Sequence, residues 1–500
     1  MKLIFEGHDE RYTVEQSLLN LFPGELPVYE PIQPGDESWA VVSCREEAGR
    51  LLVTTDLCHL GGKAAAFHTA SLSGTDYDRE GQRRHAIGAC FFQAYQSLTG
   101  NTPPWGMLTG VRPDKLTTQA LAEGKTPEEA RALLERNYYV TPERAALAAE
   151  TGLAAFEAGG DLGPRDIAVY IGVPFCPTRC AYCSFVSQSV EKSLSLVEPY
   201  VDALTAELAA GGSMVRRHGF RVRALYMGGG TPTTLSAAQL DRVLTACEEA
   251  FGPALDPGGE ITVEAGRPDT ITAEKLAVLK DHGATRVSVN PQTMEDHVLR
   301  AIGRRHSPGD IEAAMELVAK TGFRHVNMDL IAGLPEDTAE GFRRSLDRCL
   351  RFGTDNITVH TLSLKKGSRI LTEGLSIPGP QAVGEMLDYA GSVLRRAGYA
   401  PYYLYRQKYM SGSFENIGWS LPGGACLYNI YIMSELCSIL SFGAGGSTKM
   451  VDPVLKSRRI QRVFNPKYPK EYMERPEKKE ANQAAFAAFY DRGESGENRA

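Results

Sequence analysis

Residues 166–185 of this chain read DIAVYIGVPFCPTRCAYCSF, and this stretch decides the fold. Its first half, rich in isoleucine and valine, predicts a buried β-strand. Three cysteines follow the strand in a CxxxCxxC spacing: Cys176, Cys180 and Cys183. Closely spaced thiolates bind soft metal centres. The sequence therefore predicts a strand that delivers three thiolates to a metal site at its carboxyl end.

Two kinds of metal centre suit such cysteines. A structural zinc ion takes four ligands, usually from two separated CxxC pairs. No second pair lies nearby, since His218 stands alone and the next cysteine is Cys247. Three thiolates suit a [4Fe–4S] cluster in which three irons are held and the fourth lacks a protein ligand. We interpret the motif as this cluster site, with zinc as the alternative, and the open iron as a position for a chelating substrate.

Short apolar runs alternate with helical patterns from residue 166 onward. The runs are IAVYIGV (167–173), RALYMGGG (223–230), EITVEA (260–265), RVSVN (286–290), HVNMDLIAG (325–333) and NITVHTLSL (356–364). Strand alternating with helix predicts βαβ units and a parallel sheet. Six units predict an α/β fold, a partial (β/α)6 TIM-type barrel, in which active sites lie at the carboxyl ends of the strands.

The length of the chain and the changes in its sequence pattern predict three domains. A chain of 500 residues is too long for one compact core. Residues 1–160 contain predicted strands and helices of an N-terminal α+β domain, and residues 166–400 form the barrel core. Residues 401–500 form a C-terminal α+β extension that includes the tyrosine-rich strand APYYLYRQKYM and ends in a polar tail with a surface helix. Those tyrosines either form one wall of a flat pocket or belong to a half-buried strand.

Composition excludes several classes of protein. The net charge of −7 argues against a nucleic-acid partner, which usually needs a basic face. No apolar run is long enough for a membrane span, and the first residues do not resemble a signal peptide. Ten cysteines in 500 residues are too few for a disulfide scaffold, so the seven outside the motif are expected to be buried small hydrophobes. We therefore expect a cytoplasmic protein.

Unusual residues gather at the ends of the predicted strands. The turn 228–231 (GGGT) follows the second strand, and its missing Cβ atoms would let a ligand approach the backbone, unless it is simply a tight turn. Glu264 ends the third strand, Gln292 follows the fourth with Arg304 twelve residues on, and Asp329 lies within the fifth. An amide plus a guanidinium can clamp a carboxylate. Singly, each residue could be an ion pair or a surface group; together, at one end of successive strands, they favour a ligand site.

The cysteine motif resembles that of the radical S-adenosylmethionine (SAM) enzymes, CxxxCxΦC, with the aromatic Φ here at Tyr182. That resemblance implies that SAM chelates the open iron and is cleaved, after an electron from the cluster, to a 5′-deoxyadenosyl radical. Over about residues 166–450 the chain resembles the oxygen-independent coproporphyrinogen III dehydrogenase group (HemN/HemW-like). The motifs that carry this resemblance are PFCxxxCxYC, GGGTPT, the Glu-Ala after the third strand, the Gln with a downstream Gly-Arg-x-His, and DLIxGLP. The N-terminal domain and the Ser-Phe after the last cysteine are similar to the HemZ branch.

The resemblance implies a set of cofactor contacts but no residue that acts on the substrate. The implied roles are Tyr182 and Phe185 beside adenine, Gly229, Gly230 and Thr231 at the methionine end, Glu264 on the ribose, Gln292, Arg304 and Asp329 completing the pocket, with Tyr170 and Ser363 as further carry-overs. It also implies a tetrapyrrole substrate, a flavodoxin- or ferredoxin-like electron donor, and an oxidoreductase of porphyrin and haem biosynthesis. The implied reaction is oxidative decarboxylation of coproporphyrinogen III propionates to vinyl groups, giving protoporphyrinogen IX.

The chain departs from the family at three positions. The well-studied dehydrogenase has a further cysteine at the place of Phe185 and a histidine at the place of Gly172. Where the related haem chaperone has a haem-binding histidine, this chain has Tyr428, followed by the shared Asn429. Because a tyrosinate can ligate haem in some proteins, a haem-binding role stays an alternative. A radical enzyme acting on another tetrapyrrole is the third hypothesis.

Overall fold

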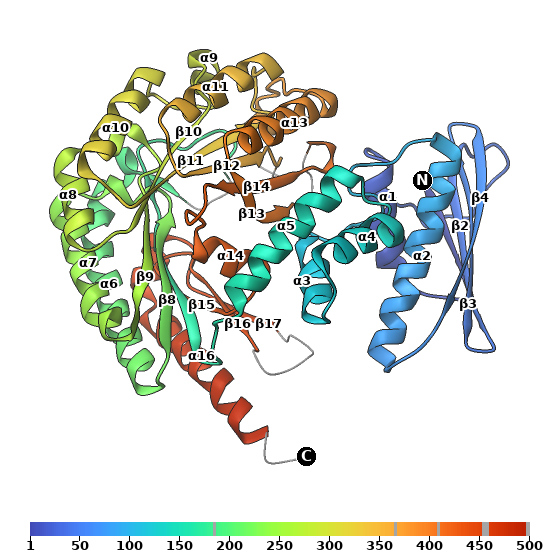
Figure 1. Ribbon diagram of the computed structural model, residues 1–500, viewed down its shortest axis with the longest axis horizontal. Coiled ribbons are helices and arrows are strands. Elements are labelled where there is room, and N and C mark those ends of the chain that lie inside the picture. Colours follow the sequence, from blue (N-terminus) through green and yellow to red (C-terminus); the bar gives the residue numbers. More distant parts are fainter. Residues whose placement is uncertain (184–186, 365–367, 408–410, 453–459, 497–500) are drawn as a thin grey trace. The chain divides into compact units, whose positions relative to one another are not determined.

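The structure, a computed structural model, describes the chain except for residues 184–186, 365–367, 408–410, 453–459 and 497–500 (Figure 1). The chain divides into two compact units, Met1–Ala149 and Glu150–Ala500. The division falls within helix α5 (Pro142–Gly159), and the domain boundaries expected from the sequence stay a prediction. Within the described parts of the chain, every helix is too short or too polar to span a bilayer.

The first unit is a four-stranded sheet in the order β1-β2-β3-β4, packed against helix α2. Its elements are β1 (Lys2–Glu6), α1 (Arg11–Leu21), β2 (Ser38–Glu47), β3 (Arg50–His59), β4 (Gly62–Ser71), α2 (Asp76–Thr99), α3 (Asp114–Ala122) and α4 (Pro127–Tyr138). A capping box between Thr75 and Asp78 starts α2, and Phe91 and Phe92 of that helix are fully buried. Strand β4 was not expected, because its GKAAAFHTAS sequence carries few β-branched residues.

The second unit contains one eleven-stranded sheet whose central seven strands are parallel. In spatial order these are β15 (Ser438–Phe442), β5 (Asp166–Val173), β8 (Arg221–Gly229), β9 (Leu255–Glu264), β10 (Arg286–Gln292), β11 (His325–Ala332) and β12 (Asn356–Thr361). The last six are the strands predicted from the sequence, so the expected α/β fold with a partial barrel is confirmed. Burial on both faces explains their near-continuous apolar runs.

Helices follow the parallel strands as the alternating pattern predicts, and Figure 1 shows α6, α7, α8 and α10 in an arc outside the strands. The helices of this unit are α6 (Val190–Arg217), α7 (Ala237–Phe251), α8 (Ala273–Asp281), α9 (Asp296–Ala301), α10 (Pro308–Thr321), α11 (Ala339–Arg351), α12 (Arg369–Thr372), α13 (Pro380–Arg396), α14 (Leu427–Ser434), α15 (Pro469–Glu474) and α16 (Pro476–Gly496). A short two-stranded sheet, β6 (Phe175–Cys176) with β7 (Gln188–Ser189), carries the first cysteine.

The C-terminal hundred residues belong to the same sheet as the barrel strands. Antiparallel β14 (Glu415–Ser420) and β13 (Ala400–Arg406) extend the sheet beyond β12, while β16 (Ser447–Val451) and β17 (Ile460–Phe464) extend it beyond β15. The boundary expected at residue 400 therefore separates strands of one sheet. Short runs such as SILSF carry no signal that tells a seventh parallel strand from a peripheral one.

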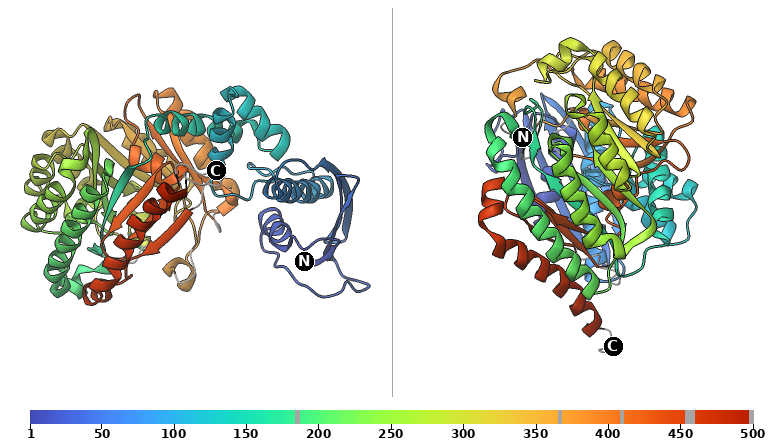
Figure 2. Two further views of the ribbon diagram at one scale, coloured as in Figure 1. Left: turned by 90° about the horizontal axis from the view of Figure 1, so that it is seen from below. Right: turned by 90° about the vertical axis from the view of Figure 1, so that its left-hand side faces the viewer.

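Helix α16 is more deeply packed than the expected surface helix. Phe486 is fully buried and lies edge-on to Phe220, and Tyr490 packs on the same ring. Figure 2 shows α16, in red, running beside α6, in green. Within this polar, charged sequence, two aromatic side chains one helical turn apart form an apolar stripe that packs against the core.

Candidate metal centre and cofactor pocket

The carboxyl ends of the parallel strands open onto a cavity of about 900 Å³. All thirteen site residues that the structure describes line it: Tyr170, Cys176, Cys180, Tyr182, Cys183, Gly229, Gly230, Thr231, Glu264, Gln292, Arg304, Asp329 and Ser363. Phe185 lies outside the described residues. The volume is in the range of cavities that hold cofactor-sized ligands. The structure thus gathers residues spread over almost 200 positions of sequence at one edge of the sheet.

The cysteine loop presents its thiols, all partly exposed, to this cavity. Thr231 Oγ1 donates to Cys176 Sγ at 3.5 Å, and burial raises the pKa of the Cys176 thiol. Among the described residues, no three His, Cys, Asp or Glu side chains are close enough to share one metal ion. A cubane cluster does not require such closeness, because each cysteine binds a different iron. Three thiolates suit a [4Fe–4S] cluster, whereas a structural zinc ion takes four protein ligands, so the number of cysteines favours the cluster.

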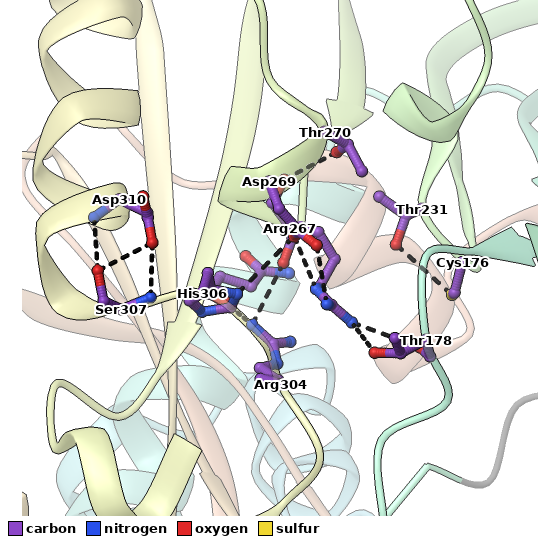
Figure 3. A network of polar contacts seen from close by, with 12 residues as sticks. Cys176, Thr178, Thr231, Arg267, Asp269, Thr270, Arg304, His306, Ser307 and Asp310 are labelled. Atoms are coloured by element: carbon purple, nitrogen blue, oxygen red, sulfur yellow. Dashed lines mark hydrogen bonds and ion pairs between the residues drawn. The ribbon is translucent and has the colours of Figure 1, made fainter. Parts of the chain in front are cut away.

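A buried arginine that the sequence pattern does not reveal lies beside the cysteine loop (Figure 3). Arg267 is 2% exposed; its Nη1 donates to Thr178 Oγ1 at 3.1 Å and lies 4.0 Å from Cys180 Sγ. Asp269 accepts from Nε at 3.0 Å and from Nη2 at 3.1 Å. Burial alone would raise the pKa of Asp269, but the neighbouring His306 and Arg267 hold it well below its usual range. A fixed positive charge thus lies beside one ligating sulfur.

Packing within the protein itself requires glycine in the turn after β8. Gly229 has a φ of 106°, which disfavours other residues. A Cβ on Gly230 would lie 2.5 Å from the carbonyl oxygen of Phe175, just before the first cysteine. The turn therefore needs glycine in order to pack against the cysteine loop, and both glycines also line the cavity.

Gln292 and Arg304 each carry a buried polar atom that has no hydrogen-bond partner in the described part of the chain. Gln292 follows a register shift at the end of β10 and has a φ of 67°, a strained value for a side-chain-bearing residue. Arg304 Nη1 donates to the Asn290 carbonyl at 2.5 Å, and Nη2 donates to Tyr182 Oη at 3.3 Å. Gln292 Oε1 and Arg304 Nε are buried without a hydrogen-bond partner among the described residues. Because such atoms are costly when left unpaired, they fit a polar ligand such as the amino-acid end of SAM.

Two carboxyl groups lie deeper in the cavity in different electrostatic settings. Burial, together with the charge of Asp329, raises the pKa of Glu264 to about 7, although Tyr226 Oη donates to its Oε1 at 2.6 Å. Asp329 is equally buried, but His360 and a 2.7 Å hydrogen bond from Asn327 Nδ2 keep its pKa below the usual value. Glu264 is thus the carboxyl group whose charge changes near neutral pH.

Tyrosine rings form one side of the cavity. Tyr170 of β5, Tyr226 of β8 and Tyr428 of α14 stack, with the centroids of Tyr226 and Tyr428 4.5 Å apart. Tyr403 and Tyr405 of β13 line the cavity as well, and their rings lie parallel. The sequence indicated β13 as a possible wall but gave no signal for Tyr226, which looks like an ordinary strand residue. These rings create the flat, apolar surface that an aromatic or macrocyclic ligand prefers.

Residues 170–349 match the Radical SAM superfamily, and the chain belongs to that superfamily. It is 36% identical over 482 residues, 95% of each chain, to the oxygen-independent coproporphyrinogen-III oxidase-like protein HemZ of Bacillus subtilis. It is 32% identical over 268 residues, 52% of this chain and 64% of the other, to the heme chaperone HemW of Mycobacterium tuberculosis (strain CDC 1551 / Oshkosh). The structure of HemN from Escherichia coli shares the fold, with a TM-score of 0.51 over 66% of this chain and 72% of the other, at 22% identity. The chain thus falls in the HemN/HemW-like group, as its motifs predict.

Because the chain belongs to the Radical SAM superfamily, its cofactors are a [4Fe–4S] cluster and SAM, as expected from the cysteine motif. The three cysteines would hold the cluster, while Gln292, Arg304 and the glycine turn would hold SAM beside it. When bound, the pair supplies a carbon radical strong enough to take hydrogen from a saturated carbon, which side chains alone cannot do. The assignment of individual residues to these roles stays our proposal.

Proposed function

We propose that the protein is a cytoplasmic, oxygen-independent enzyme of haem biosynthesis. It would convert two propionate side chains of coproporphyrinogen III to vinyl groups with loss of CO₂, giving protoporphyrinogen IX. For each propionate, one hydrogen atom would go to the cofactor radical and the remaining electron to a one-electron acceptor outside the chain. A flavodoxin- or ferredoxin-like protein would donate the electron that starts each cycle. All ten cysteines are free, which suits a reducing compartment.

One observation carries this proposal. The cavity that gathers the cysteines and the cofactor residues also has a wall of tyrosines, which suits a flat ligand beside SAM. Similarity to HemZ over nearly the whole chain supports a tetrapyrrole as the second occupant. A substrate with four carboxylates also needs cations near the opening of the cavity. Lys467, which is exposed and lines the cavity, suits one propionate.

The residues of this chain would bind, orient and keep water out. The buried tyrosines would pack on the macrocycle, and the deep carboxyl group of Glu264 would accept hydrogen bonds from ribose hydroxyls. A dry site protects a reactive radical from side reactions. No described residue is assigned a proton transfer, because the bound cofactors would supply the radical that removes hydrogen from carbon.

The haem-carrier alternative has weaker support from the site. Tyr428, at the place of the chaperone's histidine, is 4% exposed and stacks with both Tyr170 and Tyr226. Burial and the neighbouring charged and phenolic groups raise the pKa of its phenol well above the ordinary value. Burial thus favours the protonated phenol over the tyrosinate that would ligate haem, and this gives the haem-carrier alternative less support.

An anaerobic assay tests the proposal. The reconstituted protein is mixed with dithionite, SAM and coproporphyrinogen III, and the products are separated by chromatography. We expect 5′-deoxyadenosine and the divinyl product, with one SAM consumed per propionate and no product from Cys180→Ala. Deoxyadenosine with an unchanged porphyrin would refute the substrate. A stoichiometric haem absorbance band without turnover would favour the carrier, and consumption of added haem would favour action on another tetrapyrrole.

A further inference from the structure

A second cavity, of about 820 Å³, adjoins the cysteine loop. Thr178 and Arg179, which lie between the first two cysteines, form one part of its lining, and residues 303–307 form another. Arg304 lines both this cavity and the cofactor pocket. Nothing in the proposed reaction of SAM or the tetrapyrrole uses this second cavity.

Four exposed arginines surround it, in a chain whose net charge is −7: Arg179, Arg300, Arg305 and Arg369. Within the described part of the chain, no carboxylate forms an ion pair with Arg179 or Arg300. Arg305 pairs with Glu191 at 2.5 Å and Arg369 pairs with Glu373 at 2.7 Å, but these four side chains are between 44% and 67% exposed. Exposed pairs contribute at most about 1 kcal/mol, so a carboxylate on another molecule can replace Glu191.

The arginine-bearing segment is joined directly to the loop that carries the cysteines. Thr178 Oγ1 donates to the Gly303 carbonyl at 3.1 Å, and the Ala181 amide donates to the Ile302 carbonyl at 2.9 Å. Arg369 lies against the turn at Gly303, because a Cβ atom on Gly303 would be 3.4 Å from Arg369 Nη1. A molecule resting on these arginines would therefore contact a segment that is hydrogen-bonded to the cysteine loop.

We propose that this arginine-lined cavity is the docking surface for an acidic one-electron donor protein. The inference rests on the proposed function, which needs an electron from outside the chain. The donor is oxidised by one electron, and the cluster accepts that electron. Complementary charge raises the association rate of two proteins and makes it sensitive to salt.

The form of the cavity favours a protein over a small anion. A small-anion site gathers buried donors around one point. The buried side chains of Arg304 and His306 also line the cavity. The four arginines, however, are exposed and come from three separate segments, which suits several carboxylates spread over a protein surface.

The test uses a flavodoxin as the probe and the cluster-loaded full chain. Arg300→Glu/Arg305→Glu should weaken flavodoxin binding at low salt by about tenfold or more, and should slow reduction of the cluster by photoreduced flavodoxin to a similar extent. The neutral pair Arg300→Gln/Arg305→Gln should show a smaller loss. Reduction by dithionite, a small reductant that needs no docking, should be unchanged in both variants.

Arg324→Glu is the matched control. Arg324 is exposed and directly precedes β11, so it lies at the amino ends of the parallel strands, away from the cysteine loop. It should bind flavodoxin as the wild type does, apart from the general effect of net charge. Equal loss in the control and the double variant would overturn the docking site, as would wild-type binding by the double variant.

Two further outcomes separate this inference from its alternatives. Tight pyrophosphate binding at physiological salt that leaves flavodoxin binding unaffected would assign the arginines to a small anion and overturn the proposal. If the dithionite assay yields no divinyl product but flavodoxin binding is lost in the double variant, the proposed substrate fails and the docking surface stands.

Discussion

Replacing Arg267 by methionine should lower the reduction potential of the cluster. Reduction adds one negative charge, and the guanidinium beside Cys180 stabilises that charge. At an effective dielectric constant of about 20, unit charges 4.0 Å apart interact by about 4 kcal/mol. The carboxylate of Asp269, which pairs with the same guanidinium, offsets part of this interaction energy. If half of the interaction energy is offset, about 2 kcal/mol remains. For a one-electron couple, this corresponds to roughly 90 mV.

The assay is an anaerobic potentiometric titration monitored by electron paramagnetic resonance. Arg267→Met should shift the midpoint potential to more negative values, whereas Arg267→Lys, which keeps the charge, should shift it much less. Asp269→Asn removes the opposing charge and should shift the potential to more positive values. A normal iron content in Arg267→Met with a potential within about 20 mV of the wild type would refute the electrostatic reasoning. Loss of iron would instead show that Arg267 is needed to assemble the site.

Four further predictions concern the cofactor residues and the C-terminal helix. Cys180→Ala should lose bound iron and sulfide, whereas Cys247→Ala, a buried cysteine outside the motif, should keep both; equal loss would contradict the cluster assignment. Arg304→Ala should keep its iron but bind SAM more weakly by equilibrium dialysis, and loss of iron would show the assignment of Arg304 to be wrong. The folded-state pKa of Glu264, about 7, lies above its ordinary value of 4.5, so the free energy of unfolding should fall by about 3 kcal/mol as pH rises from 4.5 to above 7. Glu264→Gln should remove that part of the pH dependence in denaturant titrations at pH 5 and pH 8, and an unchanged difference between the two pH values would argue against a neutral Glu264. Phe486→Ala should lower the free energy of unfolding by about 3–5 kcal/mol, because the ring is fully buried; a loss below about 1 kcal/mol would mean that α16 contributes little to the core.

The strands and the cysteine motif could be predicted because their signals are local. An apolar run between turn residues predicts a buried strand wherever it occurs, as in β5 and β11. The rule that parallel strands place their carboxyl ends at one edge then brings Glu264, Gln292 and Asp329 together without any knowledge of side-chain contacts. The cavity contains all three, as this rule predicts.

Arg267 was missed for a physical reason. Its position, three residues after the end of β9, places it at the correct edge, but an arginine after a strand is an ordinary surface residue in most proteins. What distinguishes it is burial against Thr178 and Cys180, almost 90 positions earlier in the chain. The same limit applies to Tyr226 and Tyr428, which stack although about 200 residues separate them.

The amino-acid sequence by itself determined the kind of metal centre and the class of fold, because cysteine spacing and hydrophobic periodicity act over only a few residues. The tertiary structure alone decided which charges and rings surround that centre: a guanidinium beside one sulfur, a tyrosine wall, and arginines around a second cavity. It also made β15 the seventh parallel strand and buried α16. These features depend on contacts between distant segments, whose partners are selected by packing the whole chain at once, so no short stretch of sequence encodes them.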